Sequence, residues 1–194
     1  MSARDSERFD QGMRALNRVG LGERRQALLA LAQGRVLEIG AGAGSNGAHY
    51  PAAAHVVATD INPEHLQLTR RKGHLTRLAC ADAQQLPFPD DSFDVVCATL
   101  VFCSIPDPMQ ALGEVKRVLR PQGRLLLLEH VRGQGAISRR LTDWLNPLWL
   151  GLQGECHLNR ETARTVAAAG FRLDQVDQAG WWGVLAEIHA TKVI

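Results

Sequence analysis

Short apolar runs alternate along the chain with longer segments of helical periodicity. Val36, Leu37 and Ile39 form the first such run, and it stops abruptly at a series of glycines. A short continuous apolar run bounded by turn residues is typical of a parallel strand that is buried on both faces. The same signal recurs in five further segments, at 55–60, 75–80, 93–98, 124–130 and 171–176. The pattern predicts an α/β fold with a mostly parallel sheet.

Local capping signals mark helices between these runs. Asn62 and Asp107 each precede a proline, and an acceptor side chain followed by proline is typical of a helix start. Asn159 predicts a further start, and Gly73 predicts the end of the helix that begins at Asn62. Residues 184–193 instead alternate between two sets of side chains, which predicts an antiparallel strand with one covered face.

Residues 1–34 are predicted to form helices that lead into the first strand. The segment 3–19 has apolar positions at near-helical spacing, and two interpretations of it are open: a lid over a ligand site, or a helix packed on the core. A second helix is expected over about 23–33, ending at Gly34. Its expected inward positions are Leu28, Leu29, Leu31 and Ala32.

The glycine-rich stretch after the first strand is the clearest sign of a ligand. Glycines between Gly40 and Gly47 let the backbone close against a bound molecule. We expect a tight turn and then a helix, whose unpaired amides favour an anionic group. Asp60 ends the second strand about 20 positions after the first glycine, the spacing at which a carboxylate meets ribose hydroxyls. A nucleoside cofactor is therefore predicted.

Three features argue against a nicotinamide cofactor, although the stretch from Gly42 to Gly47 also satisfies the pattern GxGxxG. Glu38 lies just before the glycines, where a carboxylate suits a cationic ligand and would repel a pyrophosphate. Asp82 and Ala83 follow the third strand and place a second acid near a purine edge. The antiparallel C-terminal strand also differs from a second mononucleotide-binding half.

These residues resemble the class I S-adenosylmethionine (SAM)-dependent methyltransferases, from about Arg35 to the C-terminus. The stretch from Glu38 to Gly44 looks like the first motif of the family, and segments 86–94 and 115–123 are similar to its quinone and small-molecule branch. The resemblance implies one Rossmann-like domain over residues 1–194, with a seven-stranded, mostly parallel sheet, an antiparallel last strand and helices on both faces. It implies SAM as cofactor and S-adenosylhomocysteine as product. The cofactor-binding residues that it implies are Glu38, Gly40, Gly42, Asp60, Ile61, Asp82, Ala83 and Thr99.

A narrower resemblance is to the methyltransferase-like 7 group, which methylates thiols on small molecules. It lies in the segments Thr99 to Ile105, Leu127 to Val131, Leu145 to Trp149 and Cys156 to Glu161. This resemblance implies S-methylation of a small, lipophilic thiol. The alternatives are N-methylation of a phospholipid amine, C-methylation of a quinone, and a module that binds the cofactor or its product without turnover. Members of that group carry an N-terminal membrane anchor, whereas this sequence has no apolar run of about 18 residues.

His130 is the candidate catalytic residue. It ends the fifth predicted strand, and open α/β sheets present ligands at the carboxyl ends of their strands. A thiol with a pKa near 8.5 is only a few per cent ionised at neutral pH, so a nearby base or cation would help. The other interpretation is a structural histidine that bonds the adjoining loop. We expect no role for His49, His55, His65 and His74.

Residues 137–157 depart from the repeating strand and helix pattern, because leucines and tryptophans crowd around Pro147. Three interpretations are open. The segment is a substrate cap, a helix pair packed on the sheet, or a shallow interfacial helix in peripheral contact with a membrane, since Arg139 and Arg140 lie beside the tryptophans. We favour the cap. It predicts acceptor contacts from Trp144, Trp149, His157 and Asn159.

Composition narrows the class of protein further. The 194 residues suit one domain, and a net charge of +2 gives no reason to expect a nucleic-acid partner. Cys80, Cys97, Cys103 and Cys156 show no CxxC spacing. We therefore expect reduced thiols in a cytoplasmic protein and no metal site, with a small molecule as the partner and the oligomeric state open. Arsenic methyltransferases, which hold the metalloid with several cysteines, are a minor alternative.

Overall fold

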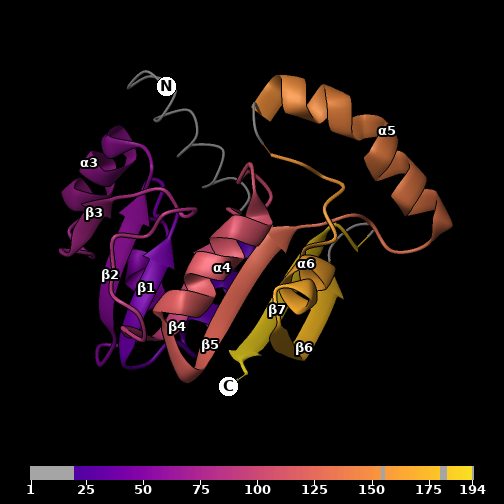
Figure 1. Cartoon of the computed structure of the whole chain (residues 1–194). Coiled ribbons are helices and arrows are strands. Elements are labelled where there is room, and N and C mark those ends of the chain that lie inside the picture. Colours follow the sequence, from indigo (N-terminus) through magenta and orange to yellow (C-terminus); the bar gives the residue numbers. More distant parts are fainter. Residues whose placement is uncertain (1–19, 154–155, 180–182, 194) are drawn as a thin grey trace.

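One seven-stranded sheet runs through the protein in the order β3-β2-β1-β4-β5-β7-β6 (Figure 1). The computed structural model describes residues 20–153, 156–179 and 183–193, so the segment 3–19, with its lid interpretation, lies outside the described residues. The strands are β1 (Arg35–Ile39), β2 (His55–Asp60), β3 (Leu78–Cys80), β4 (Phe93–Thr99), β5 (Leu119–His130), β6 (Phe171–Ala179) and β7 (Leu185–Lys192). Strands β1 to β5 pair in parallel, and β7 is antiparallel to β5 and β6. The predicted sheet is confirmed.

Helices cover both faces of this sheet. They are α2 (Gly22–Leu29), the 3₁₀ helix η2 (Gly47–His49), α3 (Pro63–Lys72), α4 (Pro108–Val118), α5 (Ala136–Gln153) and α6 (Thr162–Ala168). Helices α4 and α6 lie on the near face of the sheet in Figure 1. Leu112 of α4 and Val166 of α6 belong to one core cluster. Leu28 and Leu29 of α2 belong to a second cluster, with Val36 and other strand residues. Apolar burial on both faces explains why the central strands lack alternation.

The local capping signals correctly predict two helices. The Asn62 side chain accepts a hydrogen bond from the Glu64 amide at 2.9 Å, and Gly73 ends α3 with a φ of 74°. At the start of α4, the Asp107 carboxylate accepts from two backbone amides at 3.0 Å. Each cap satisfies backbone groups that a helix end leaves unpaired.

Three local expectations were wrong. The glycine stretch leads into η2, three residues long, and not into an α-helix. Helix α2 ends at Leu29, which leaves Leu31 exposed. Helix α6 begins at Thr162 and not at Asn159, because tertiary bonds hold the preceding segment. In that segment the His157 amide donates to the Cys103 carbonyl at 2.9 Å.

Helix α5 lies beyond the carboxyl end of β5 and is one continuous helix despite Pro147 (Figure 1). The interpretation of residues 137–157 as a helix pair is therefore wrong. The buried positions of α5 include the polar side chains of Ser138, Thr142 and Asn146, whereas the large apolar side chain of Trp144 is exposed. Within the ranges that the structure describes, no helix has the length and apolar content that a bilayer span requires.

Candidate cofactor and acceptor site

The glycine loop after β1 packs closely on the loop after β4. Gly40 has a φ of 71°, and a Cβ atom there would lie 2.3 Å from Cγ2 of Val101. Both the left-handed backbone and the lack of space require glycine at this position. Gly42 donates its amide to Oδ2 of Asp60 at 2.8 Å, and its carbonyl accepts from the Thr69 hydroxyl at 2.9 Å. The loop is thereby tied to β2 and α3.

Asp60 lies at the carboxyl end of β2, as expected. Its Oδ1 atom accepts from the Asn62 amide at 2.8 Å and lies 3.3 Å from Nδ1 of His65. His65, for which we expected no role, thus contacts the predicted ribose-binding acid. Ile61, the next residue, is 68% exposed at the same edge. An acid with an exposed apolar neighbour suits a sugar hydroxyl pair beside a flat base.

The predicted purine-side acid is held by its own turn. The Asp82 carboxylate accepts from the Gln84 amide at 2.8 Å, while Ala83 is buried in the core. The Gln84 side chain in turn accepts from the Asp107 amide at 2.9 Å, which joins this turn to the start of α4. Asp82 therefore sits in an ordered turn after β3, next to the strand that carries Asp60.

A buried polar network joins the amino-terminal part of the chain to the glycine loop. Asn46 donates to Oε1 of Glu38 at 2.8 Å, and the Tyr50 hydroxyl donates to Oε2 at 3.1 Å. Arg25 donates to the Asn46 side chain, and to the Thr99 hydroxyl at 2.8 Å. Burial raises the pKa of Glu38 to about 7, against the opposing effect of these hydrogen bonds.

The surroundings of the Glu38 carboxylate differ from those expected. Its carboxylate is fully covered by protein, and both oxygens have protein partners. We expected direct contact with a cationic ligand. The structure instead gives Glu38 the role of positioning Asn46 and Tyr50, and through Asn46 the guanidinium of Arg25.

Arg25 is a buried cation of this network that the sequence pattern did not single out. Its side chain is only 2% exposed, and burial lowers its pKa. Among the described residues, its Nε and Nη2 atoms have no hydrogen-bond partner. Leaving a buried donor unpaired is costly, and more so on a charged group. The two unpaired atoms fit an anionic ligand group, such as the carboxylate of the methionine moiety of SAM.

The loop after β4 is shaped by a buried acid on β5. The Glu129 carboxylate accepts from the amides of Val101 and Phe102 at 3.0 Å and of Cys103 at 3.2 Å. Burial raises the pKa of Glu129, and the three amides oppose that rise. Leu100, at the start of this loop, has a φ of 59°, which is strained for a leucine. Strain of this kind persists where surrounding contacts impose it, often at functional sites.

His130 ends β5, as expected, and contacts two residues from the segment after it. Its Nδ1 atom lies 3.6 Å from Sγ of Cys156, and its ring meets Trp149 edge-on with centroids 6.2 Å apart. Sγ of Cys156 lies 3.4 Å from Sγ of Cys103. Contact with Cys103, and then with His130 and Trp149, lowers the pKa of Cys156. Our expectation of no metal site was based on the spacing of cysteines along the chain. Spacing does not reveal this pair, because its two cysteines are 53 residues apart in the sequence.

The residues predicted to contact the acceptor divide into two groups. Trp149 lies against His130, and His157 bonds the Cys103 carbonyl through its amide. Asn159 is half-buried in the same loop. Trp144 is 76% exposed on α5, so most of its side chain faces solvent.

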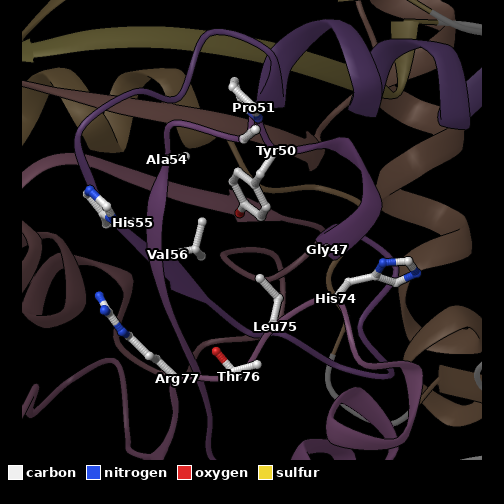
Figure 2. A pocket seen from close by; sticks show the side chains of 11 residues that line it. Gly47, Tyr50, Pro51, Ala54, His55, Val56, His74, Leu75, Thr76 and Arg77 are labelled. Carbon is white, nitrogen blue, oxygen red and sulfur yellow. The ribbon is translucent and has the colours of Figure 1, made fainter.

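A hollow of about 320 Å³ lies away from all these residues except Tyr50. In Figure 2, His55 and Arg77 lie on one side of it and His74 on the other. His55 begins β2 and Arg77 precedes β3, so this hollow is at the amino ends of the strands. Parallel α/β sheets bind ligands at the opposite ends. We assign it no role in the site.

Comparison with known proteins agrees with this arrangement. The methyltransferase domain family matches residues 37–127. Thiol S-methyltransferase TMT1B of Rattus norvegicus is 37% identical over 150 residues, which is 73% of this chain and 62% of the rat protein. Demethylmenaquinone methyltransferase of Clavibacter sepedonicus is 37% identical over 122 residues, which is 61% of this chain and 50% of that protein. The chain thus spans less than two thirds of the length of either relative.

A solved structure reproduces the whole fold. The SAM-dependent methyltransferase of Aquifex aeolicus superimposes with a TM-score of 0.71 over 100% of both chains, at 18% identity. At that identity the likeness concerns the fold alone. Together with the glycine loop, the acids after β2 and β3, and the antiparallel β7, these matches show that the chain belongs to the class I SAM-dependent methyltransferase family.

Proposed function

We propose that this protein transfers the methyl group of SAM to a small, lipophilic thiol. The observation that carries the proposal is that one short segment, residues 99–103 at the end of β4 and in the loop after it, joins two chemically different groups of side chains. At its start, Thr99 bonds the buried Arg25. At its end, Cys103 meets His130 and Cys156. A cofactor anchor and a sulfur-rich acceptor side thus meet at neighbouring strand ends.

The residues on the cofactor side suit each part of SAM. The two nitrogens of Arg25 that have no partner within the described part of the chain fit the methionine carboxylate, Asp60 fits the ribose hydroxyls, and Asp82 with Ile61 fits the adenine side. When bound, SAM supplies a methyl carbon made electrophilic by its sulfonium. The protein's own contribution is orientation and the exclusion of water, with reacting atoms about 3 to 3.5 Å apart as the geometric target.

The acceptor side suits a thiol because a thiol must ionise before it attacks. His130 stands at the end of β5, and the guanidinium of Arg160 donates to the Phe102 carbonyl at 2.6 Å within the same loop. An imidazole and a cation at this edge favour the ionised acceptor. The names of the rat relative and of its human counterpart, both thiol S-methyltransferases, support this acceptor class.

A second acceptor class has support from one relative and one surface. The Clavibacter sepedonicus relative is a demethylmenaquinone methyltransferase, which favours C-methylation of a lipophilic quinol. The exposed face of α5 presents Ile137, Trp144 and Leu148, with Arg139 and Arg140 also exposed. An apolar helix face flanked by cations is typical of peripheral contact with an anionic membrane, where lipophilic acceptors gather.

Product analysis tests the proposal. The full chain is incubated with SAM and, in separate reactions, a panel of small thiols, a phospholipid amine and a demethylated quinol, and products are identified by mass spectrometry. We expect a methyl thioether and S-adenosylhomocysteine from thiols. Asp60→Ala serves as the variant with a weakened cofactor site, and Asp177→Ala, at an exposed position, is its matched control. If the reactions yield a methylated quinol and no thioether, a quinol and not a thiol is the acceptor. Binding of SAM with no product from any acceptor would favour a non-catalytic module.

A further inference from the structure

Three side chains from separate parts of the chain form a compact group at the carboxyl edge of the sheet. Their potential ligand atoms, two sulfurs and an imidazole nitrogen, all lie within 4.8 Å of one another; the residues are Cys103, His130 and Cys156. The two sulfur atoms are 3.4 Å apart, and Sγ of Cys156 is 3.6 Å from Nδ1 of His130. We call these residues the Cys2His cluster.

Two of these separations are within about 0.4 Å of the edges of a tetrahedral zinc site. Zinc binds cysteine sulfur at about 2.3 Å and histidine nitrogen at about 2.0 Å, which places two sulfurs about 3.8 Å apart and a sulfur and a nitrogen about 3.5 Å apart. A disulfide would use the two cysteines alone. The presence of His130 beside Cys156 is accounted for by a metal and not by a disulfide.

We propose that the Cys2His cluster binds one thiophilic divalent cation of the zinc type, and that the open fourth position takes the acceptor thiol as a thiolate. Three protein ligands with one open position are typical of catalytic zinc, whereas structural sites are closed by four. The part of the proposal that concerns the acceptor rests on the proposed function. The metal site itself does not.

Two of the ligands are held by rigid parts of the fold. Cys103 donates its amide to Glu129, and its carbonyl accepts from His157. His130 is paired with Leu185 in the ladder between β5 and β7. Cys156 lies on the loop between α5 and α6 and completes the set. A metal site of two fixed ligands and one loop ligand can close around an ion with little movement of the sheet.

The charges around the cluster also suit this role. Two thiolates and a neutral imidazole neutralise a divalent cation. A bound acceptor thiolate then adds one negative charge. The guanidinium of Arg160, which interacts electrostatically with Cys103, Glu129 and Cys156, offsets part of the negative charge around the cluster, which limits the cost of burying the occupied site.

The reaction balances without a further reagent. As the acceptor sulfur binds the cation, its S–H bond breaks and the proton passes to water. The sulfur then forms a bond to the methyl carbon while the bond between that carbon and the sulfonium breaks, giving a thioether and neutral S-adenosylhomocysteine. A neutral thioether is a weaker ligand than a thiolate, so the next thiol displaces it.

Cobalt titration of the full chain tests the metal site independently of catalysis. The protein is treated with a chelator and a phosphine reductant, both reagents are removed without exposure to air, and Co²⁺ is then added while the absorption spectrum is followed. We expect one ion per chain, with the sulfur-to-cobalt charge-transfer bands and strong visible bands of a tetrahedral ion. Cys103→Ser, His130→Gln and Cys156→Ser should each weaken binding at least about tenfold. Cys80→Ser, an exposed cysteine outside the cluster, is the matched control.

A second arm tests the acceptor position. Addition of butanethiol to the cobalt protein should increase the sulfur-to-cobalt charge transfer, and its methyl thioether should not. Wild-type protein that binds Co²⁺ no better than Cys103→Ser would overturn the metal site, and so would a Cys103–Cys156 disulfide that persists after reduction. If the metal site were overturned in this way, thiol methylation that continues in the presence of chelator would leave the proposed function standing.

The acceptor position has its own outcome. If cobalt binds but butanethiol does not change the spectrum, the acceptor position is overturned. Product analysis would still decide whether the protein methylates thiols.

Discussion

The Nη1 atom of Arg25 donates a hydrogen bond of 2.8 Å to the hydroxyl of Thr99, and this bond joins helix α2 to the carboxyl end of β4. The same guanidinium reaches the Asn46 side chain, which binds Glu38 at the end of β1. Three elements that meet at the glycine loop are thus fixed by one buried cation. Its two remaining nitrogens have no partner among the described residues.

Replacing Arg25 with methionine should weaken SAM binding about tenfold to a hundredfold, because hydrogen bonds to charged groups contribute about 1.5 to 3 kcal/mol. Calorimetric titration measures the affinity. Arg24→Met is the matched control, because Arg24 is the preceding residue and its long, 3.4 Å ion pair with Asp177 lies at the surface. Thermal melts of both variants show whether they remain folded. Equal SAM affinity in folded Arg25→Met and wild-type protein would remove Arg25 from the cofactor site.

Replacing Asp60 with alanine should weaken SAM binding by roughly 1.5 to 3 kcal/mol, through the loss of charge-assisted bonds to the ribose. The variant also loses the 2.8 Å bond that holds the Gly42 amide, so the loop becomes less ordered. Calorimetry again gives the affinity. Asp90→Ala, at an exposed acid, should bind SAM as the wild type does. An Asp60→Ala affinity as high as that control would contradict the assignment.

The strands and most caps could be predicted because their signals are local, whereas the arrangement of the seven strands in one sheet was implied only by the family resemblance. An apolar run, an alternating segment or an Asn-Pro pair is read within a few residues, and tertiary packing agreed with it. The helix expected after the glycines is limited to the three residues of η2 by a side-chain hydrogen bond and by a nearby proline. Asn46 turns its side chain to Glu38, and η2 ends before Pro51.

The buried site residues could not be chosen from the sequence because their partners are distant. Arg25 meets Thr99 across 74 positions, so the sequence does not show which group its guanidinium bonds. One signal was present: Arg25 shares a helical face with Leu21 and Leu28, where a charged residue is out of place. Cys103 and Cys156 had no such signal, since only the loop after α5 brings them together.

Gly40→Ala should lower the free energy of unfolding by about 2 to 4 kcal/mol, more than Gly73→Ala does. Both glycines have a positive φ, of 71° and 74°, so both variants carry a backbone strain of about 1 kcal/mol. Only at Gly40 would the new Cβ meet a neighbour, Cγ2 of Val101 at 2.3 Å, and overpacking costs about 1 to 3 kcal/mol more. Urea denaturation measures both. Equal losses would show that the packing on Val101 can relax.

Glu38→Gln should remove a pH dependence of stability. The pKa of Glu38 rises from 4.5 to about 7 on folding, so the native state binds more protons than the unfolded state between these values. The free energy of unfolding must therefore fall as pH rises through this window, by about 3 kcal/mol in all. Urea denaturation from about pH 5 to about pH 8 should show a shallower fall in Glu38→Gln than in the wild type. Parallel curves would mean that burial does not disfavour the charged form.

The exposed face of α5 should bind anionic membranes. Ile137, Trp144 and Leu148 are exposed there, and burying a large apolar side chain contributes about 1.5 to 3 kcal/mol. Exposed Arg139 and Arg140 add attraction to anionic headgroups. We expect the full chain to sediment with phosphatidylserine-containing vesicles more than with neutral ones.

A double variant, Trp144→Gln with Leu148→Gln, should lower the vesicle affinity at least about tenfold, because it removes two of the side chains that enter the bilayer surface. Met109→Gln, at an exposed apolar residue of α4, is the matched control and should sediment as the wild type does. The double variant should still bind SAM normally, since Arg25 and Asp60 lie on other elements. Equal sedimentation of the double variant and the control would exclude this face from membrane contact and leave lipophilic acceptors to reach the site from solution.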